Sequence, residues 1–161
     1  MPINIKINLI GFDILTKLVR KDDAFEMAEH ARDIIYKRTK FGFGSTAGGE
    51  RYKLPPLADL TIKIRRAFAK DRRRKQGKFF SPARSNLTMT GQLLESMHSR
   101  RTGEGKAKLV IRKNKRRRSD LTNLALAEKL EARGFRFFGL NVGERRIVIN
   151  RYRREIERRL Q

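Results

Sequence analysis

The sequence predicts a protein of mixed α and β structure, and three patterns in its 161 residues support this fold class. Apolar and polar residues alternate near the N-terminus, which is typical of a half-buried strand. Two further strand-like runs flank the turn sequence Thr102–Gly105, which is typical of a β-hairpin. Elsewhere apolar residues recur every three or four positions, as they do on one face of a helix. We expect one domain over residues 1–161 with a substantial core.

The strongest signal in the composition is a formal net charge of +23, from 40 Lys and Arg against 17 Asp and Glu. Such an excess favours association with polyanions, namely nucleic acid, acidic protein surfaces or anionic lipid. The alternative is that the basic residues only solvate the surface. The chain has no Cys, which excludes disulfides and thiolate sites. No apolar run approaches the roughly 18 residues that span a bilayer, and the alternating N-terminus does not resemble a signal peptide, so we expect no membrane partner.

The N-terminal segment is expected to contain one strand followed by helices. The alternation predicts a strand over about residues 3–10, and residues 12–19 have the spacing of a short helix or turn. A longer helix is predicted from about Asp22 to Lys40, with acidic residues at its start and basic residues at its end. One face of this helix is a stripe of small residues that permits close approach of another helix, in the same chain or in a second copy. The stripe consists of Ala24, Ala28, Ala31 and Ile35.

Residues 41–53 are predicted to form a glycine-rich loop. Its glycines match neither spacing of a phosphate-binding loop, and a helix rather than a strand precedes it. We therefore expect an extension that becomes ordered against another subunit or a partner. The candidate contact residues in this loop are Phe41, Phe43, Arg51 and Tyr52.

Two basic loops, residues 70–78 and 112–118, are the candidate surfaces for contact with DNA, another polyanion or a partner. Before the first loop, Pro55-Pro56 predicts the start of a helix. The apolar face of that helix would consist of Leu57, Leu60, Ile64 and Phe68. Neither loop has interleaved aromatic residues, so phosphate contact without reading of bases is the most that they support; the alternative is two solvated loops. The candidate contact residues are Arg72, Arg73, Arg74, Lys75, Lys78, Lys113, Lys115, Arg116, Arg117 and Arg118.

Residues 87–97 predict a turn followed by a short helix. Thr90 can cap this helix and Gly91 can form the turn, while Leu93 and Met97, four residues apart, can dock on the core. A hairpin of residues 97–101 and 106–112 follows, and its buried face would consist of Ala107, Leu109 and Ile111.

The C-terminal third is expected to be helical. Ser119 or Asp120 can cap a helix that ends at Gly134. Asn141 and Glu144 have the spacing of a capping box for a last helix over about residues 144–160. Its apolar residues recur every four positions: Val148, Tyr152, Ile156 and Leu160. A strand over residues 146–150 is the competing interpretation.

The sequence shows no pattern of catalytic or metal-binding residues. His30 and His98 are the only histidines, and neither has carboxylates at metal-ligand spacing. No Ser lies in a G-x-S-x-G motif, and no pair of carboxylates stands out for acid–base chemistry. We therefore predict a structural or binding protein without a catalytic site, metal or cofactor; an unrecognised nuclease is the enzymatic alternative.

Three motifs, in order along the chain, resemble those of one protein family. They are T-G-Q-L-L-E-S-M at residues 90–97, the loop and helix over Gly48–Arg65, and R-G-F-R-F-F-G-L-N over Arg133–Asn141. Together they resemble the tail-completion proteins of tailed phages, the virion morphogenesis and minor tail component families that include tail terminators. One departure is Asn123, where the family often has Tyr. The motif residues with a structural role are Thr90, Gly91, Leu93, Ser96, Arg133, Phe135 and Phe138.

This resemblance implies an α/β (α+β) fold, with a mostly antiparallel sheet on which helices pack. It also implies a virion protein, made in the host cytoplasm, that forms a ring, typically hexameric, at the neck or tail terminus. Such a ring caps the tail tube and joins it to the head–tail connector. The implied partners are copies of itself, the tail tube protein, the connector or neck proteins, and genomic DNA in the channel as a further candidate. The alternative function is sequence-independent nucleic-acid binding, of ribosomal or packaging type.

Overall fold

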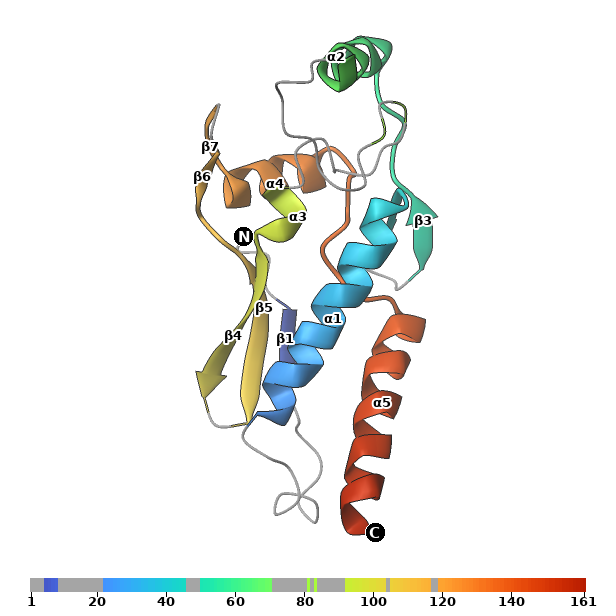
Figure 1. The fold of residues 1–161 in the computed structure, drawn as a ribbon, viewed down its shortest axis with the longest axis vertical. Coiled ribbons are helices and arrows are strands. Elements are labelled where there is room, and N and C mark those ends of the chain that lie inside the picture. Colours follow the sequence, from blue (N-terminus) through green and yellow to red (C-terminus); the bar gives the residue numbers. More distant parts are fainter. Residues whose placement is uncertain are drawn as a thin grey trace.

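The computed structural model describes residues 5–8, 22–45, 50–70, 81, 83, 92–103, 105–116 and 119–161 (Figure 1). All strand pairs in these ranges are antiparallel, and helices pack beside the largest sheet, so the fold is α+β, as predicted. The elements in order are β1 (Ile5–Asn8), α1 (Asp23–Lys40), β2 (Phe43–Ser45), β3 (Arg51–Lys53), α2 (Asp59–Lys70), α3 (Gln92–Glu95), β4 (Met97–Gly103), β5 (Lys106–Ile111), β6 (Lys115–Arg116), β7 (Ser119–Thr122), α4 (Asn123–Ala132) and α5 (Val142–Leu160).

The largest sheet has three strands in the order β1–β5–β4. The middle strand β5 pairs Leu109 with Ile5 on one side and with Ser99 on the other. Ala107, Leu109 and Ile111 are all buried, which confirms the predicted inner face of the hairpin. The N-terminal strand is confirmed over Ile5–Asn8, and the short helix or turn predicted at residues 12–19 lies outside the described residues.

Helix α1 lies between the sheet and α5 (Figure 1). Its small-residue stripe is fully buried, and Ala24 and Ala28 pack with Ala107 of β5. These two alanines therefore lie against the sheet, whereas Ala31 and Ile35 belong to the main core, which also contains Val148 of α5. Small side chains let the helix backbone approach the pleated surface, and α5 then packs against another side of α1.

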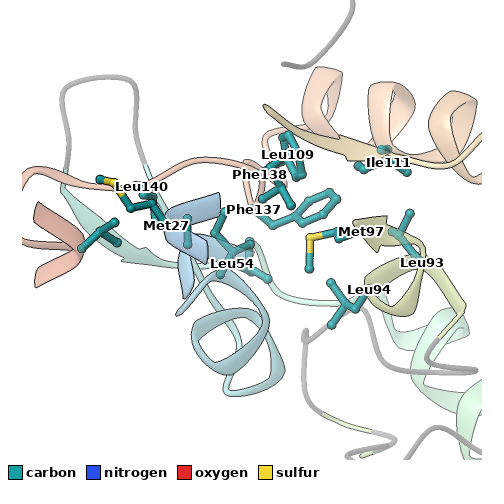
Figure 2. Packing of buried hydrophobic residues seen from close by; sticks show 14 residues of the cluster. Met27, Leu54, Leu93, Leu94, Met97, Leu109, Ile111, Phe137, Phe138 and Leu140 are labelled. Atoms are coloured by element: carbon teal, nitrogen blue, oxygen red, sulfur yellow. The ribbon is translucent and has the colours of Figure 1, made fainter. Parts of the chain in front are cut away.

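The main core forms where the hairpin, α1, α3 and the segment before α5 meet (Figure 2). Phe137 is fully buried at its centre, and its ring contacts that of Phe138 edge to face, with 6.3 Å between the ring centroids. Leu93 and Met97 are buried there, as predicted, although Met97 begins β4 and does not extend α3. Thr90 and Gly91, the predicted cap and turn of this helix, lie outside the described residues.

The ends of the two C-terminal helices follow local signals. Gly134 has φ +83° after α4, and the amides of Gly134 and Phe135 donate to the carbonyls of Glu131 and Leu130, as in a Schellman motif. The predicted stop at Gly134 is thus confirmed. The predicted cap at Ser119 or Asp120 is wrong, because both residues lie in β7. The hydroxyl of Thr122 caps α4 instead, since it accepts from the Ala125 amide.

The capping box of Asn141 and Glu144 is present at the start of α5. The helix continues without interruption through residues 146–150, so the competing strand interpretation is wrong. Val148 and Ile156 are buried, as the four-residue repeat predicted.

Helix α2 is present as predicted, but its apolar face is only partly covered. Phe68 is buried, whereas Leu60 and Ile64 are 70% and 53% exposed. The predicted glycine-rich loop over residues 41–53 is also different, because β2 and β3 form an antiparallel pair within it. In the second basic segment, Lys115 and Arg116 form β6 and pair with β7.

Candidate functional site

Most of the predicted cationic contact residues cannot be placed relative to one another. Residues 71–80, which contain the whole run Arg72–Lys75 and Lys78, lie outside the described residues, as do Arg117 and Arg118. Lys113 is exposed just after β5, and the backbone of Lys115 and Arg116 forms β6. Contact of these basic segments with DNA or a partner remains a prediction.

The four residues predicted to contact a partner through the glycine-rich segment have different surroundings. Phe41 is exposed at the end of α1, and the guanidinium of Arg51 lies 3.9 Å from the centroid of the Phe43 ring. The Tyr52 hydroxyl accepts from the Arg136 amide at 2.7 Å and donates to the Gly134 carbonyl at 2.8 Å. Tyr52 therefore joins β3 to the segment after α4 within the chain, a role that its position in the sequence did not suggest.

Of the other motif residues, Ser96 is buried, and its hydroxyl donates to the Leu93 carbonyl at 2.6 Å. Arg133 is the exposed C-cap of α4. Phe135 and Phe138 both belong to the main core. These residues support the fold at the described positions.

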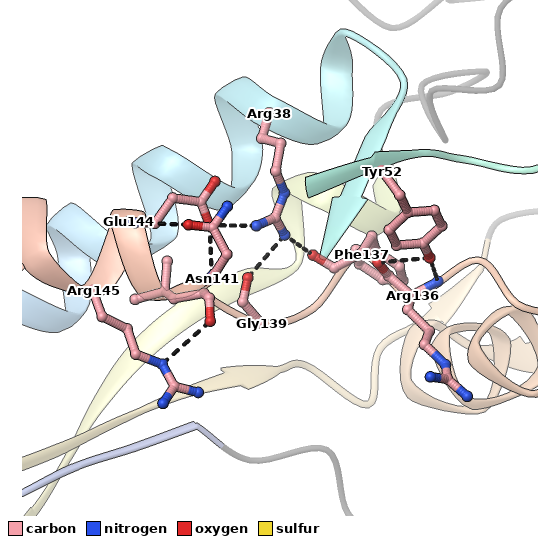
Figure 3. Close-up of polar contacts among 9 residues, drawn as sticks. Arg38, Tyr52, Arg136, Phe137, Gly139, Asn141, Glu144 and Arg145 are labelled. Carbon is pink, nitrogen blue, oxygen red and sulfur yellow. Dashed lines mark hydrogen bonds and ion pairs between the residues drawn. The ribbon is translucent and has the colours of Figure 1, made fainter. Parts of the chain in front are cut away.

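Helices α1 and α5 are joined at one end by a buried cation, Arg38 (Figure 3). Its guanidinium donates to Glu144 at 2.5 Å and to the carbonyls of Phe137 and Gly139 at 2.6 and 2.8 Å. Burial lowers the pKa of Arg38, and the Glu144 carboxylate opposes this shift. Glu144 thus both caps α5 and balances the charge of Arg38.

At the other end, Arg159 of α5 forms a bidentate ion pair with Asp23 of α1, with N–O distances of 2.8 and 2.9 Å. The Tyr152 hydroxyl donates to the same carboxylate at 3.2 Å. Burial and the adjacent Asp23 raise the pKa of Tyr152 to about 12. The start of α1 thus contacts the end of α5, and the end of α1 contacts the start of α5. The two helices are therefore antiparallel.

Between these two contacts, a surface groove of about 550 Å³ lies along the two helices. His30 comes from α1, and the other lining residues come from α5: Ile147, Asn150, Arg151, Arg154, Glu155 and Arg158. Arg151 donates to His30 Nδ1 at 3.1 Å. Burial and the Arg151 cation lower the pKa of His30. Three arginines and one glutamate give the lining a positive charge.

A second cationic surface lies on the sheet. The register pairs Lys108 of β5 with Arg100 of β4 on one side and with Lys6 of β1 on the other. Arg100 and Lys108 thus lie directly opposite each other, although like charges in such a pair are destabilising. This pair favours binding of an anion that would neutralise it.

The charged side chains that line the groove are mainly cationic. No group of three or more His, Cys, Asp and Glu residues in the described part of the chain could hold a metal ion. No helix in this part is both long and apolar enough to cross a membrane. Comparisons with protein-family models, with curated proteins and with solved structures found no match for this chain.

Sequence reasoning missed the groove, because its residues carry no motif. His30 appeared only as a histidine without carboxylates at metal-ligand spacing, and the arginines of the last helix were not singled out. The available signal was the recurrence of Arg151, Arg154 and Arg158 at intervals of three and four residues, which places them on one side of a helix.

Proposed function

We propose that this protein is a structural subunit of a tailed-phage virion. It forms a ring at the neck or tail terminus, which caps the tail tube and joins it to the head–tail connector. The resemblance of three ordered motifs to tail-completion proteins supports this assignment, and the α+β fold is compatible with it. The ring would be made of copies of this chain, most simply six.

The structural observation that carries the proposal is the presence of exposed apolar side chains on two helices. On α5, three apolar side chains are about half exposed: Val142, Ile147 and Ile149. On α2, Ile64 is also about half exposed, and Leu60 is 70% exposed. Figure 1 shows α2 at one end of the molecule, away from α5, whose first half carries Val142, Ile147 and Ile149. A cyclic ring needs two different surfaces on each subunit, because its contacts join one subunit head to tail with the next.

The positive charge sets a further condition on such a ring. Closing a ring brings several copies of a chain with net charge +23 together, and their mutual repulsion opposes assembly. Acidic neighbouring proteins or DNA in the channel would relieve it. We therefore expect assembly to strengthen as salt rises from low concentration, because salt screens repulsion between exposed charges.

The proposal is tested by native mass spectrometry and negative-stain imaging of the purified protein, together with immunogold labelling of virions. We expect closed rings in solution and label at the neck. Ile149→Ser with Leu60→Ser should reduce ring formation while the monomer stays folded. Lys37→Ser with Lys63→Ser, which alter exposed charged residues of α1 and α2, serves as the matched control. A protein that stays monomeric at all concentrations and is absent from virions would contradict the proposal.

The second candidate function is sequence-independent nucleic-acid binding, which the pair of Arg100 and Lys108 on the sheet and the cationic groove favour. In that case the purified protein would bind duplex DNA as a monomer, and its affinity would fall steeply with salt because phosphate contacts release counterions. A salt slope near zero would exclude this function.

A further inference from the structure

We infer that the groove between α1 and α5 is a binding site for the phosphate groups of a DNA backbone, with Arg151 and Arg154 as the contact residues. This inference names the site of the polyanion contact proposed above and rests on that contact. It does not require a ring.

The arginines of the groove form a line rather than a cage. Arg151, Arg154 and Arg158 follow one another at intervals of three and four residues, so neighbouring side chains start about 5–6 Å apart on the helix surface. Seven residues of helix cover about 10 Å. Phosphates on one strand of B-DNA recur about every 3.4 Å of helix axis. A line of cations of this length therefore suits a chain of successive phosphates better than one compact anion.

Two of these arginines are not neutralised within the described part of the chain. Arg158 pairs with Glu155 at 2.8 Å. Arg151 and Arg154 form no ion pair with a carboxylate of the described residues, and Arg151 contacts only the imidazole of His30. Arginine is the residue best suited to phosphate, because its planar guanidinium can donate two parallel hydrogen bonds. The side-chain amide of Asn150, between these charges, adds a neutral donor.

His30 makes the affinity of this site for phosphate depend on pH. Its Nδ1 accepts a hydrogen bond from Arg151, so this nitrogen carries no proton in the observed arrangement. Arg151 and Lys37 oppose protonation of His30, and Asp33 favours it; Arg154, Glu155 and Arg158 also line the groove. A phosphate bound by Arg151 would release Nδ1 and offset the local positive charge. His30 then gains a proton on binding, and affinity for DNA rises as the pH falls through the titration range of the imidazole.

The test measures binding of a short fluorescent DNA duplex to the full chain by anisotropy, at several salt concentrations and between about pH 5.5 and pH 8. Arg151→Gln with Arg154→Gln should lower the affinity about tenfold and make the salt slope shallower by about two. Arg146→Gln with Arg153→Gln removes the same charge from exposed positions of α5 outside the groove, and its effect should be less than about threefold. Equal losses in both double variants would overturn the inference, because they would reflect net charge alone.

A second readout uses the two histidines of the chain. Their ring signals can be followed by NMR as the pH is varied, with and without DNA. We expect DNA to raise the pKa of His30, whereas the ring signals of His98, on β4, should not respond to DNA. His30→Gln should abolish the pH dependence of binding while the protein stays folded. An unchanged His30 titration, or tighter binding of polyglutamate than of DNA at this groove, would overturn the inference. Ring formation by the Arg151→Gln, Arg154→Gln variant is measured in parallel and should be intact, which separates this site from the proposed assembly.

Discussion

Arg159, near the end of α5, donates two hydrogen bonds of 2.8 and 2.9 Å to the carboxylate of Asp23, in the first turn of α1. The Asp23 carboxylate is only 2% exposed, so water cannot replace its partner if that partner is lost. Together with Arg38 and Glu144 at the opposite end, this pair fixes both ends of the α1–α5 contact.

We predict that Arg159→Met destabilises the protein by about 3 kcal/mol, because it removes the bidentate cation of a buried carboxylate. Urea denaturation measures the change in the free energy of unfolding. Arg158→Met is the matched control: its side chain is 76% exposed, and it should change stability by less than about 0.5 kcal/mol. Similar losses of unfolding free energy in the two variants would show that the ion pair with Asp23 does not stabilise the protein more than an exposed pair does.

Arg38 should be still more sensitive to substitution. Arg38→Met leaves the Phe137 and Gly139 carbonyls and the Glu144 carboxylate without their donor, and we expect a loss of about 3–5 kcal/mol. Glu144→Gln leaves the buried Arg38 cation without its carboxylate but keeps an oxygen that can accept from Arg38 and from the Asn141 amide, so its cost should be smaller, about 2–3 kcal/mol. Thermal unfolding of both variants tests this order, with the exposed neighbour Lys37→Met as the control. A larger loss for Glu144→Gln would contradict our account of the network.

Tyr152 should make the protein less stable in alkali. Its pKa is raised from 10.0 to about 12 in the folded state. Between these pH values the unfolded chain releases the Tyr152 proton while the folded chain keeps it, so the free energy of unfolding falls as the pH rises. Tyr152→Phe should lessen this fall, as measured by urea denaturation at about pH 9 and about pH 11. An identical pH dependence in both proteins would refute the assigned pKa.

Gly44 should tolerate no side chain. A Cβ built at this residue would lie 2.3 Å from the Arg136 carbonyl oxygen and 2.7 Å from the Tyr52 ring. We expect Gly44→Ala to cost about 1–3 kcal/mol, since backbone must move to make room. Gly139→Ala is the control, because a Cβ there meets nothing within 4 Å. Calorimetry of the two variants measures their thermal stability. An unchanged stability of Gly44→Ala would mean that β2 lies farther from Arg136 than described.

Features determined by neighbouring residues could be predicted from the sequence. The capping box at Asn141, the stop at Gly134 and the inner face of β5 each depend on a few adjacent positions. The cap of α4 was misplaced because three residues with a hydroxyl or carboxyl group precede the helix closely: Ser119, Asp120 and Thr122. The pairing of β7 with β6 keeps the first two in a strand, so Thr122 becomes the cap.

Features that depend on distant segments could not be predicted. Arg38 looked like a favourable charge at a helix end, and only the fold brings it to Phe137 and Glu144. The same holds for Tyr52, whose hydroxyl meets residues that lie far away in sequence, and for His30 beside Arg151. Leu60 and Ile64 show the converse: the helical pattern was correct, but no described segment covers that face.

The strand order β1–β5–β4 also constrains how the protein can be made. Ile5 pairs with Leu109, and Asp23 pairs with Arg159, so the first strand and the first long helix complete their contacts with segments that are synthesised much later. A nascent chain that still lacks β5 exposes the alanine stripe of α1 and has no partner for β1. Long-range contacts of this kind close slowly. The contacts of β1 and of the start of α1 can therefore form only after β5 and the end of α5 have been synthesised.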